Sequence, residues 1–239
     1  MGRAFEYRKE RKMKRWANMA RVFTRMGREI AIAVKEGGPD PHYNPRLRLA
    51  IQNAKAANMP KANIESAIKR ASEKDAANYE EIVYEGYAPH GIAVIVETAT
   101  DNPTRTVANV RHIFSKYGGS LGVSGSVDYM FSRKGVFTVS KANIPDLESF
   151  ELEMIDHGLE DIKEDEENLL LYCDFQDYGN LSKALEEQGI EVAEAKLDRI
   201  PSHYKQLSEE EVEEVIKLIE KMEDDEDVQQ VFHNMDMSE

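Results

Sequence analysis

The sequence predicts an α+β fold in which an N-terminal three-helix bundle precedes two α/β (ferredoxin-like) domains, one inserted in the other. Apolar residues at helical spacing fill about the first 77 residues, and short alternating strands follow from Tyr79. A strand, helix, strand, strand, helix, strand order then occupies residues 136–198, which is the split βαβ pattern. The predicted domains are residues 1–78, residues 79–134 together with 200–239, and the inserted residues 135–199.

The first helix is predicted over residues 16–35, because apolar side chains recur there at spacings of three and four. Gly37, Gly38 and Pro39 are expected to end it. Its apolar stripe comprises Met19, Val22, Phe23, Met26, Ile30, Ala33 and Val34.

Two shorter helices complete the predicted bundle. Asn44 is expected to cap the second helix, with Pro45 at its first helical position, and the third helix begins near Pro60. Three short amphipathic helices of this kind can enclose one small core. The inward-facing residues are Leu47, Ala50, Ile51, Ala54, Ile64, Ala67, Ile68 and Ala71.

The residues after Tyr79 predict strands over 82–87 and 92–98, joined by a turn at 88–91. A helix over about 104–117 follows, with three apolar residues on one face. A third strand is expected where Val127, Tyr129 and Phe131 alternate with polar residues.

The next pieces form a complete unit by themselves. They are the segments 136–139, 147–157, 159–164, 169–173, 181–188 and 190–197. A helix over 208–222 and a strand over 228–232 are left over and need another partner. The simplest topology therefore makes the middle unit an insertion within one split domain.

Charge is divided unevenly along the chain. The first 74 residues hold 18 Lys and Arg against 7 Asp and Glu, a net charge of +11. The rest of the chain holds 13 basic against 38 acidic residues, a net charge of −25. A split of this size indicates a nucleic-acid-binding part joined to an acidic body, although the whole chain carries −14.

Basic residues in the N-terminal part are the predicted phosphate contacts. Arg21, Arg25 and Arg28 are spaced to share the face of the first helix opposite its apolar stripe. Aromatic residues among the first sixteen could stack on exposed bases. The alternative is an ordinary solvated helix face behind a basic tail. The candidate residues are Arg3, Arg8, Lys9, Arg11, Lys12, Lys14, Arg15, Arg21, Arg25, Arg28, Arg46 and Arg48.

No pattern in the sequence predicts an enzyme, a metal site or a cofactor. The glycine-rich run 118–126 follows a helix, precedes a strand and lacks a lysine, so a flexible connector is expected in place of a phosphate loop. The acidic clusters 164–167 and 223–227 are expected to be solvated loops. The six histidines are scattered, and no small-molecule substrate is indicated.

The lone Cys173 excludes an internal disulfide and is expected to be a small core residue. No stretch approaches the roughly 18 apolar residues of a membrane span. The first residues lack the apolar core of a signal peptide. A cytoplasmic protein without membrane contact is therefore expected.

Several strings closely resemble the YebC family, and the resemblance covers essentially the whole chain. A helical N-terminal domain and one α/β domain inserted in another are what this resemblance implies. The matching strings are Asn44-Pro45-Arg46-Leu47-Arg48, Tyr84-Glu85-Gly86-Tyr87, Thr100-Asp101-Asn102 with Arg105-Thr106, Val110-Arg111-His112 with Phe114-Ser115-Lys116, Gly118–Gly122, and Gly125-Ser126-Val127 with Tyr129 and Phe131.

The same resemblance implies a DNA-binding transcriptional regulator, and the family includes mitochondrial relatives that activate translation. This chain departs from the family at its start. The usual opening Gly-His-Ser-Lys-Trp is replaced, and Trp16 comes later. Contacts made by the usual opening residues therefore do not carry over to this chain.

Three classes of function remain open on the sequence alone. The first is a non-enzymatic nucleic-acid-binding regulator of gene expression, with DNA as the first target and ribosomal RNA, in a translation factor, as the second. The fold class does not separate these two targets. The second class is a module whose acidic α/β body docks a partner protein. The third is a hydrolase that uses the acidic clusters.

Overall fold

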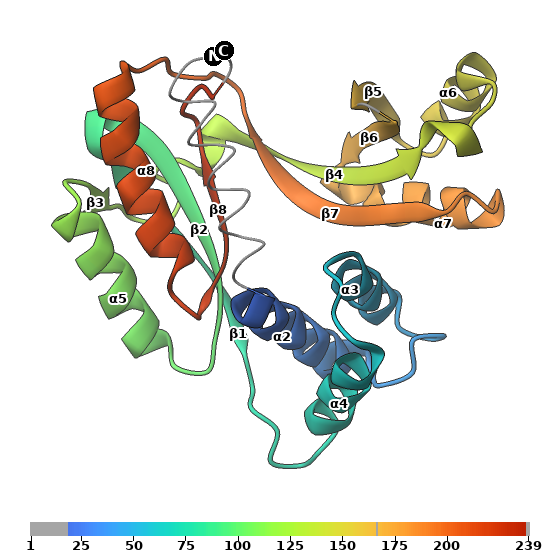
Figure 1. Ribbon diagram of the computed structural model, residues 1–239, viewed down its shortest axis with the longest axis horizontal. Helices are drawn as coiled ribbons and strands as arrows, with labels where there is room; N and C mark the ends of the chain where they lie inside the picture. The colour runs from blue at the N-terminus through green and yellow to red at the C-terminus, as the bar shows by residue number, and fades with distance from the viewer. Residues whose placement is uncertain (1–18, 166, 238–239) are drawn as a thin grey trace. The chain divides into compact units, whose positions relative to one another are not determined.

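The computed structural model describes residues 19–165 and 167–237, and it shows a mixed α+β fold with two four-stranded sheets (Figure 1). The described residues form two compact units. The first contains the described residues of 1–50, 59–131 and 201–239. The second contains residues 51–58 and 132–200.

Three N-terminal helices follow the predicted order: α2 (Met19–Gly37), α3 (Pro45–Ala56) and α4 (Lys61–Ala71). Asn44 caps α3 as predicted, because its Oδ1 accepts the Leu47 N–H at 3.0 Å. The same side chain donates from Nδ2 to the carbonyls of Ala33 and Gly38, at 2.7 and 2.8 Å. One buried amide thus joins the end of α2 to the start of α3.

The apolar faces of these helices are buried largely as predicted. On α2, Ile30 and Ala33 are fully buried, whereas Val22 and Phe23 are only half-buried. On α4, the buried residues are Ile64, Ala67 and Ala71.

The first sheet has the strand order β3-β1-β2-β8. Its long strands β1 (Glu80–Ala88) and β2 (Ile92–Thr100) are antiparallel, and β8 (Val228–His233) pairs antiparallel with β2. The helices α5 (Pro103–Lys116) and α8 (Glu209–Glu223) pack on the sheet in one buried cluster that includes Val94, Val96, Phe114 and Ile219. The predicted pairing of the late helix and strand with this earlier segment is therefore present.

The third strand of this sheet is not where the sequence predicted it. The strand is β3 (Ser120–Leu121), which pairs with β1, and residues 128–130 form a 3-10 turn. The Glu85 carboxylate explains the difference, because it accepts the N–H groups of Val127 and Asp128, each at 2.8 Å. Backbone groups that a strand would pair with a neighbour are satisfied here by a buried side chain.

The glycine-rich run, which was expected to be a flexible connector, makes backbone contacts with β1. Gly122 donates to the Glu85 carbonyl at 2.8 Å, and Gly125 donates to Oε1 of the same residue at 2.7 Å. The expected close backbone approach is present, since a Cβ on Gly119 would lie 2.5 Å from the Tyr87 carbonyl oxygen.

The second unit confirms the split βαβ prediction. Its strand order β5-β6-β4-β7 puts the first and third strands of the unit in the middle of the sheet. The elements in chain order are β4 (Phe131–Ser140), α6 (Leu147–Ile155), β5 (Leu159–Asp165), β6 (Asn168–Asp174), α7 (Tyr178–Glu187) and β7 (Val192–Pro201). Cys173 is buried, and burial raises the pKa of its thiol to about 11.

Among the described residues, no helix is both long enough and apolar enough to cross a bilayer.

Candidate nucleic-acid interface

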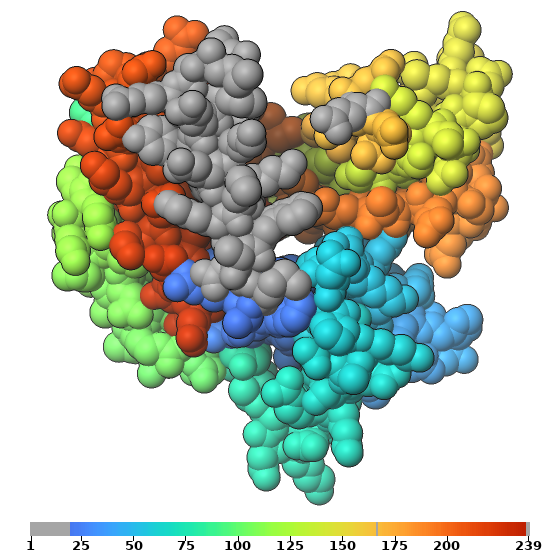
Figure 2. All heavy atoms as spheres, viewed as in Figure 1, coloured from blue at the N-terminus to red at the C-terminus, as the bar shows by residue number. Residues whose placement is uncertain are grey.

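The three arginines of α2 lie on one face of the helix, and that face meets the acidic turn between α8 and β8. Arg21 forms an ion pair with Asp224. Arg25 donates to the Glu223 carbonyl. In Figure 2 the red spheres of this turn adjoin the blue spheres of α2. The basic stripe and the acidic cluster, which the sequence presented as separate features, contact each other.

Arg28 makes the deepest of these contacts. Its Nη1 donates to Asp227 Oδ1 at 2.9 Å, to the Ala99 carbonyl at 2.9 Å and to the Glu226 carbonyl at 2.6 Å. Its side chain is 11% exposed, and the guanidinium carbon lies 5.2 Å from the ring centre of Tyr79. Arg28 is therefore an internal link between α2 and the first sheet.

Asp227 is a buried carboxylate held by groups from two helices. Its side chain is 3% exposed. It accepts from Arg105 Nη2 at 2.8 Å and from the Thr106 hydroxyl at 2.8 Å, both in the first turn of α5. Burial raises the pKa of Asp227, but hydrogen bonds from Arg105, Thr106 and Arg28 outweigh burial and lower it below its usual range. The expectation that residues 223–227 form a solvated loop was wrong at this position.

The other two described candidates are also engaged within the chain. Arg46 pairs with Glu36 at 2.6 Å and with Glu81 at 2.7 Å. Arg48 donates to the carbonyls of Pro41 and His42, at 3.0 and 2.9 Å. As contacts to nucleic acid, all five described arginines stay a prediction.

The remaining candidates lie outside the described residues. They are Arg3, Arg8, Lys9, Arg11, Lys12, Lys14 and Arg15.

Glu29 is an unusual carboxylate on α2 that no sequence pattern predicted. Burial raises the pKa of Glu29 to about 7, and the nearby carboxylates of Glu81 and Glu97 add to this. Arg46 and Arg25 act in the opposite direction but do not cancel the effect. Glu29 therefore takes up a proton near neutral pH.

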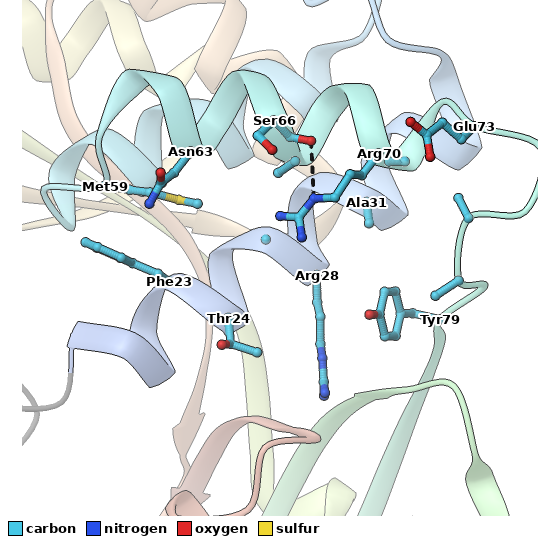
Figure 3. A pocket seen from close by; sticks show the side chains of 15 residues that line it. Phe23, Thr24, Arg28, Ala31, Met59, Asn63, Ser66, Arg70, Glu73 and Tyr79 are labelled. Atoms are coloured by element: carbon cyan, nitrogen blue, oxygen red, sulfur yellow. Dashed lines mark hydrogen bonds between the residues drawn. The ribbon is translucent and has the colours of Figure 1, made fainter.

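A groove of about 680 Å³ lies between α2 and α4 (Figure 3). Phe23 and Met59 lie at one end and Tyr79 at the other. Arg70 reaches from α4 toward α2, with its Nε donating to the Ser66 carbonyl at 3.4 Å. The groove combines aromatic rings, exposed polar side chains and an arginine, which are the groups that nucleic-acid sites use.

The sequence pattern predicted neither this groove nor the Asp227 network. Gly27, a glycine in the interior of α2 that lines the groove, was an available signal. For the network, the signal was the polar string Thr100-Asp101-Asn102 with Arg105-Thr106, at the end of β2 and the start of α5.

The second acidic cluster contains an ordinary ion pair. Glu164 accepts from Lys141 at 2.7 Å, and this hydrogen bond lowers the pKa of Glu164. Within residues 19–165 and 167–237, no three His, Cys, Asp or Glu side chains are grouped to hold a metal ion.

Comparison with known proteins gives the same family along the whole chain. Residues 3–74 match the model of the TACO1/YebC protein N-terminal domain. Residues 79–235 match the TACO1/YebC second and third domain.

Three relatives are each named a probable transcriptional regulatory protein. The one from Porphyromonas gingivalis is 59% identical, covering 98% of this chain and 97% of the relative. Relatives from Parabacteroides distasonis, 57% identical, and Flavobacterium johnsoniae, 56% identical, also cover 98% of this chain and 97% and 99% of their own lengths. These names describe transcriptional regulation, which is a non-enzymatic role.

A solved structure supports the fold. The crystal structure of a conserved hypothetical protein from Aquifex aeolicus matches with a TM-score of 0.76 and 42% identity, covering 91% of this chain and 90% of that one. The family models, the relatives and this structure agree with the resemblance found in the sequence, and the chain belongs to the TACO1/YebC family.

Proposed function

We propose that this protein is a nucleic-acid-binding regulator of gene expression, with DNA as its first target and ribosomal RNA as the alternative. The observation that carries the proposal is the charge split, +11 in the first 74 residues against −25 in the rest. Phosphates attract such a segment whatever the base sequence, and the acidic body repels them. The names of the relatives, which refer to transcriptional regulation, support the same class of function.

Two groups of cations are proposed as the phosphate contacts. The first is the basic set within residues 1–15, which carries the highest density of positive charge in the chain. The second is the exposed set on α3, on α4 and just beyond it, namely Lys55, Lys61, Lys69, Arg70 and Lys74. The arginines of α2 donate hydrogen bonds to the acidic turn in this structure. They are therefore proposed as phosphate contacts only in a state where those hydrogen bonds are broken.

Titration of the full-length protein across a series of salt concentrations tests the proposal. Labelled duplex DNA and a structured RNA of equal length serve as probes. The logarithm of the affinity is expected to fall linearly with the logarithm of salt, with a slope near −0.9 per duplex phosphate neutralised. Replacing Lys12, Lys14 and Arg15 with Gln should reduce that slope by up to about three phosphate equivalents.

A matched control removes the same charge from the acidic body. Lys116, Lys183 and Lys217 are exposed there, and replacing all three with Gln should leave the slope unchanged. Equal effects of the two triple variants, or no salt-dependent binding by the parent protein, would contradict the proposal.

The ratio of the affinities for duplex DNA and for structured RNA decides which of the two is the target. The connection from α2 to α3 runs from Gly38 to Asn44, which is longer than the turn of a helix-turn-helix motif. Recognition by shape and phosphate, which suits RNA as well as DNA, is consistent with that connection. Tighter binding of the duplex at equal salt supports DNA, and tighter binding of the structured RNA supports the translation-factor alternative.

A further inference from the structure

Small residues line the groove between α2 and α4 and leave it open, and at Gly27 no neighbouring atom requires the residue to be small. Gly27 lies in the interior of α2, where glycine is less favourable than alanine. A Cβ built on Gly27 would meet no atom within 4 Å. The fold itself therefore gives no steric reason for a glycine here. A side chain at this position would occupy the groove.

The walls of the groove are suited to a flat ring. Ala31 on α2 and Ala67 on α4 contribute only methyl groups, so the space between the helices stays wide. Phe23 is half-buried at one end and Tyr79 half-buried at the other. Tyr79 is positioned by Arg28, whose guanidinium lies against its ring. Aromatic rings held in this way are surfaces on which a base can stack.

The rim of the groove supplies hydrogen-bonding groups and charge. Thr24, Asn63 and Ser66 are exposed polar residues that line it. Arg70 extends over it, and among the described residues the partner of its guanidinium is the Ser66 carbonyl in its own helix, which accepts from Nε. Glu73 lies at the Tyr79 end and repels a phosphate there, so Arg70 is the group that a phosphate would meet.

From these features we infer that the groove binds one unpaired nucleotide of a nucleic acid, with the base between the helices and a neighbouring phosphate on Arg70. The inference rests on the proposed function and adds the kind of structure recognised, a base outside the double helix. A volume of about 680 Å³ falls within the range of small-ligand sites. Exposed amide and hydroxyl groups beside aromatic rings suit a base, which has a polar edge and a flat face. They suit an aliphatic ligand less well.

The test uses the full-length protein and hairpins that carry a single bulged 2-aminopurine, whose fluorescence falls when it stacks. Fully paired hairpins of the same length are the comparison, and both are made as RNA and as DNA. The parent protein is expected to bind the bulged hairpin about tenfold more tightly than the paired one and to quench the bulged base. If the protein prefers the bulged hairpin only when it is made of RNA, the bound nucleotide belongs to RNA. If the preference is equal for RNA and DNA hairpins, the groove accepts a nucleotide of either.

Gly27→Leu puts a side chain into the groove from a position where a Cβ meets no atom within 4 Å, and leucine has better helix propensity than glycine. It should abolish the preference and the quenching while leaving the salt-dependent affinity for the paired hairpins unchanged. Gly179→Leu is the matched control, because Gly179 is also a helical glycine with no atom within 4 Å of a built Cβ. Arg70→Gln should weaken bulge binding severalfold while the quenching at saturation persists.

The outcomes separate the two proposals. If the parent binds none of the hairpins, the proposed function fails and the inference fails with it. If the parent binds them but Gly27→Leu keeps the preference for the bulge, only the groove inference is overturned.

Discussion

Arg28 and Asp227 are 199 residues apart in sequence, and their side chains meet at 2.9 Å. Both are largely buried, at 11% and 3% exposure. Asp227 also accepts from Arg105 and Thr106, so one carboxylate connects α2, α5 and the start of β8. Removing one partner from a buried ion pair leaves the other charge uncompensated, which costs more than the pair contributes.

Asp227→Asn is therefore expected to lower the free energy of unfolding by about 3 kcal/mol. The asparagine keeps the size of the side chain but leaves Arg28 and Arg105 facing a neutral group. Urea unfolding of parent and variant measures the loss. Asp101→Asn is the control, because Asp101 pairs with Arg105 at the surface and should cost less than about 1 kcal/mol. Equal losses in the two variants would contradict the buried network.

The raised pKa of Glu29 predicts that the free energy of unfolding falls as pH rises. Its pKa is about 7 in the folded protein and about 4.5 in the unfolded chain, so the folded state binds the proton more tightly. The contribution of Glu29 is fully present below pH about 4.5 and is lost as pH rises through about 7. Glu29→Gln should match the parent at pH 4.5 and be more stable by about 1–3 kcal/mol at pH 8.

Unfolding curves for parent and Glu29→Gln at several pH values between 4.5 and 8 measure this difference. The exposed Glu65→Gln on α4 is the control for the loss of one surface carboxylate. A constant offset between Glu29→Gln and the parent at every pH would contradict the raised pKa.

The hydrogen bonds of the Glu85 carboxylate predict that a substitution at this residue loosens the glycine-rich run locally. Its carboxylate accepts backbone N–H groups from Gly125, Val127 and Asp128, at 2.7, 2.8 and 2.8 Å. Glu85→Gln replaces one acceptor oxygen with an NH₂ donor, so at least one of the three N–H groups loses its partner. The cost is about 1–3 kcal/mol where the N–H that loses its partner is buried. Amide hydrogen exchange should become faster at residues 122–128 and stay unchanged in α6 and α7. Unchanged protection at 122–128 would mean that β3 alone holds the run.

Elements defined by local chemistry could be predicted from the sequence. Asn44 caps α3 as expected. A capping box of Ser208 and Glu211, which are three residues apart, begins α8. The order of strands and helices in the second unit could be predicted because the apolar residues of each segment have the spacing of a strand or of a helix.

Features that depend on distant residues could not be predicted in this way. Glu85 takes the backbone N–H groups of the expected third strand, and no local pattern shows that a strand residue will do so. Asp227 looked like one more residue in an acidic turn until Arg28 and Arg105 were placed beside it. The α2–α4 groove is defined by missing side chains, including that of Gly27, and periodicity gives no signal for an empty space.

The contact between Arg21 and Asp224 predicts that the acidic turn competes with phosphates for α2. Both side chains are partly exposed, at 39% and 42%, so the pair adds little to stability and can exchange partners. Asp224→Asn should leave the unfolding midpoint nearly unchanged and release Arg21 for a phosphate. The affinity for duplex DNA at low salt should rise severalfold, and the salt slope should steepen by up to about 0.9.

Asp156→Asn makes the same change of net charge at an exposed residue of the second unit, and it separates local competition from general repulsion. Among the described residues Asp156 pairs with no arginine of α2, so removing its charge releases no guanidinium for a phosphate and should raise the affinity much less. Fluorescence anisotropy of a labelled duplex measures both variants beside the parent. If Asp156→Asn raises the affinity as much as Asp224→Asn does, the turn acts only through the overall charge of the acidic body. A rise confined to Asp224→Asn shows that α2 binds either its own turn or a phosphate, because one guanidinium cannot hold both at full strength.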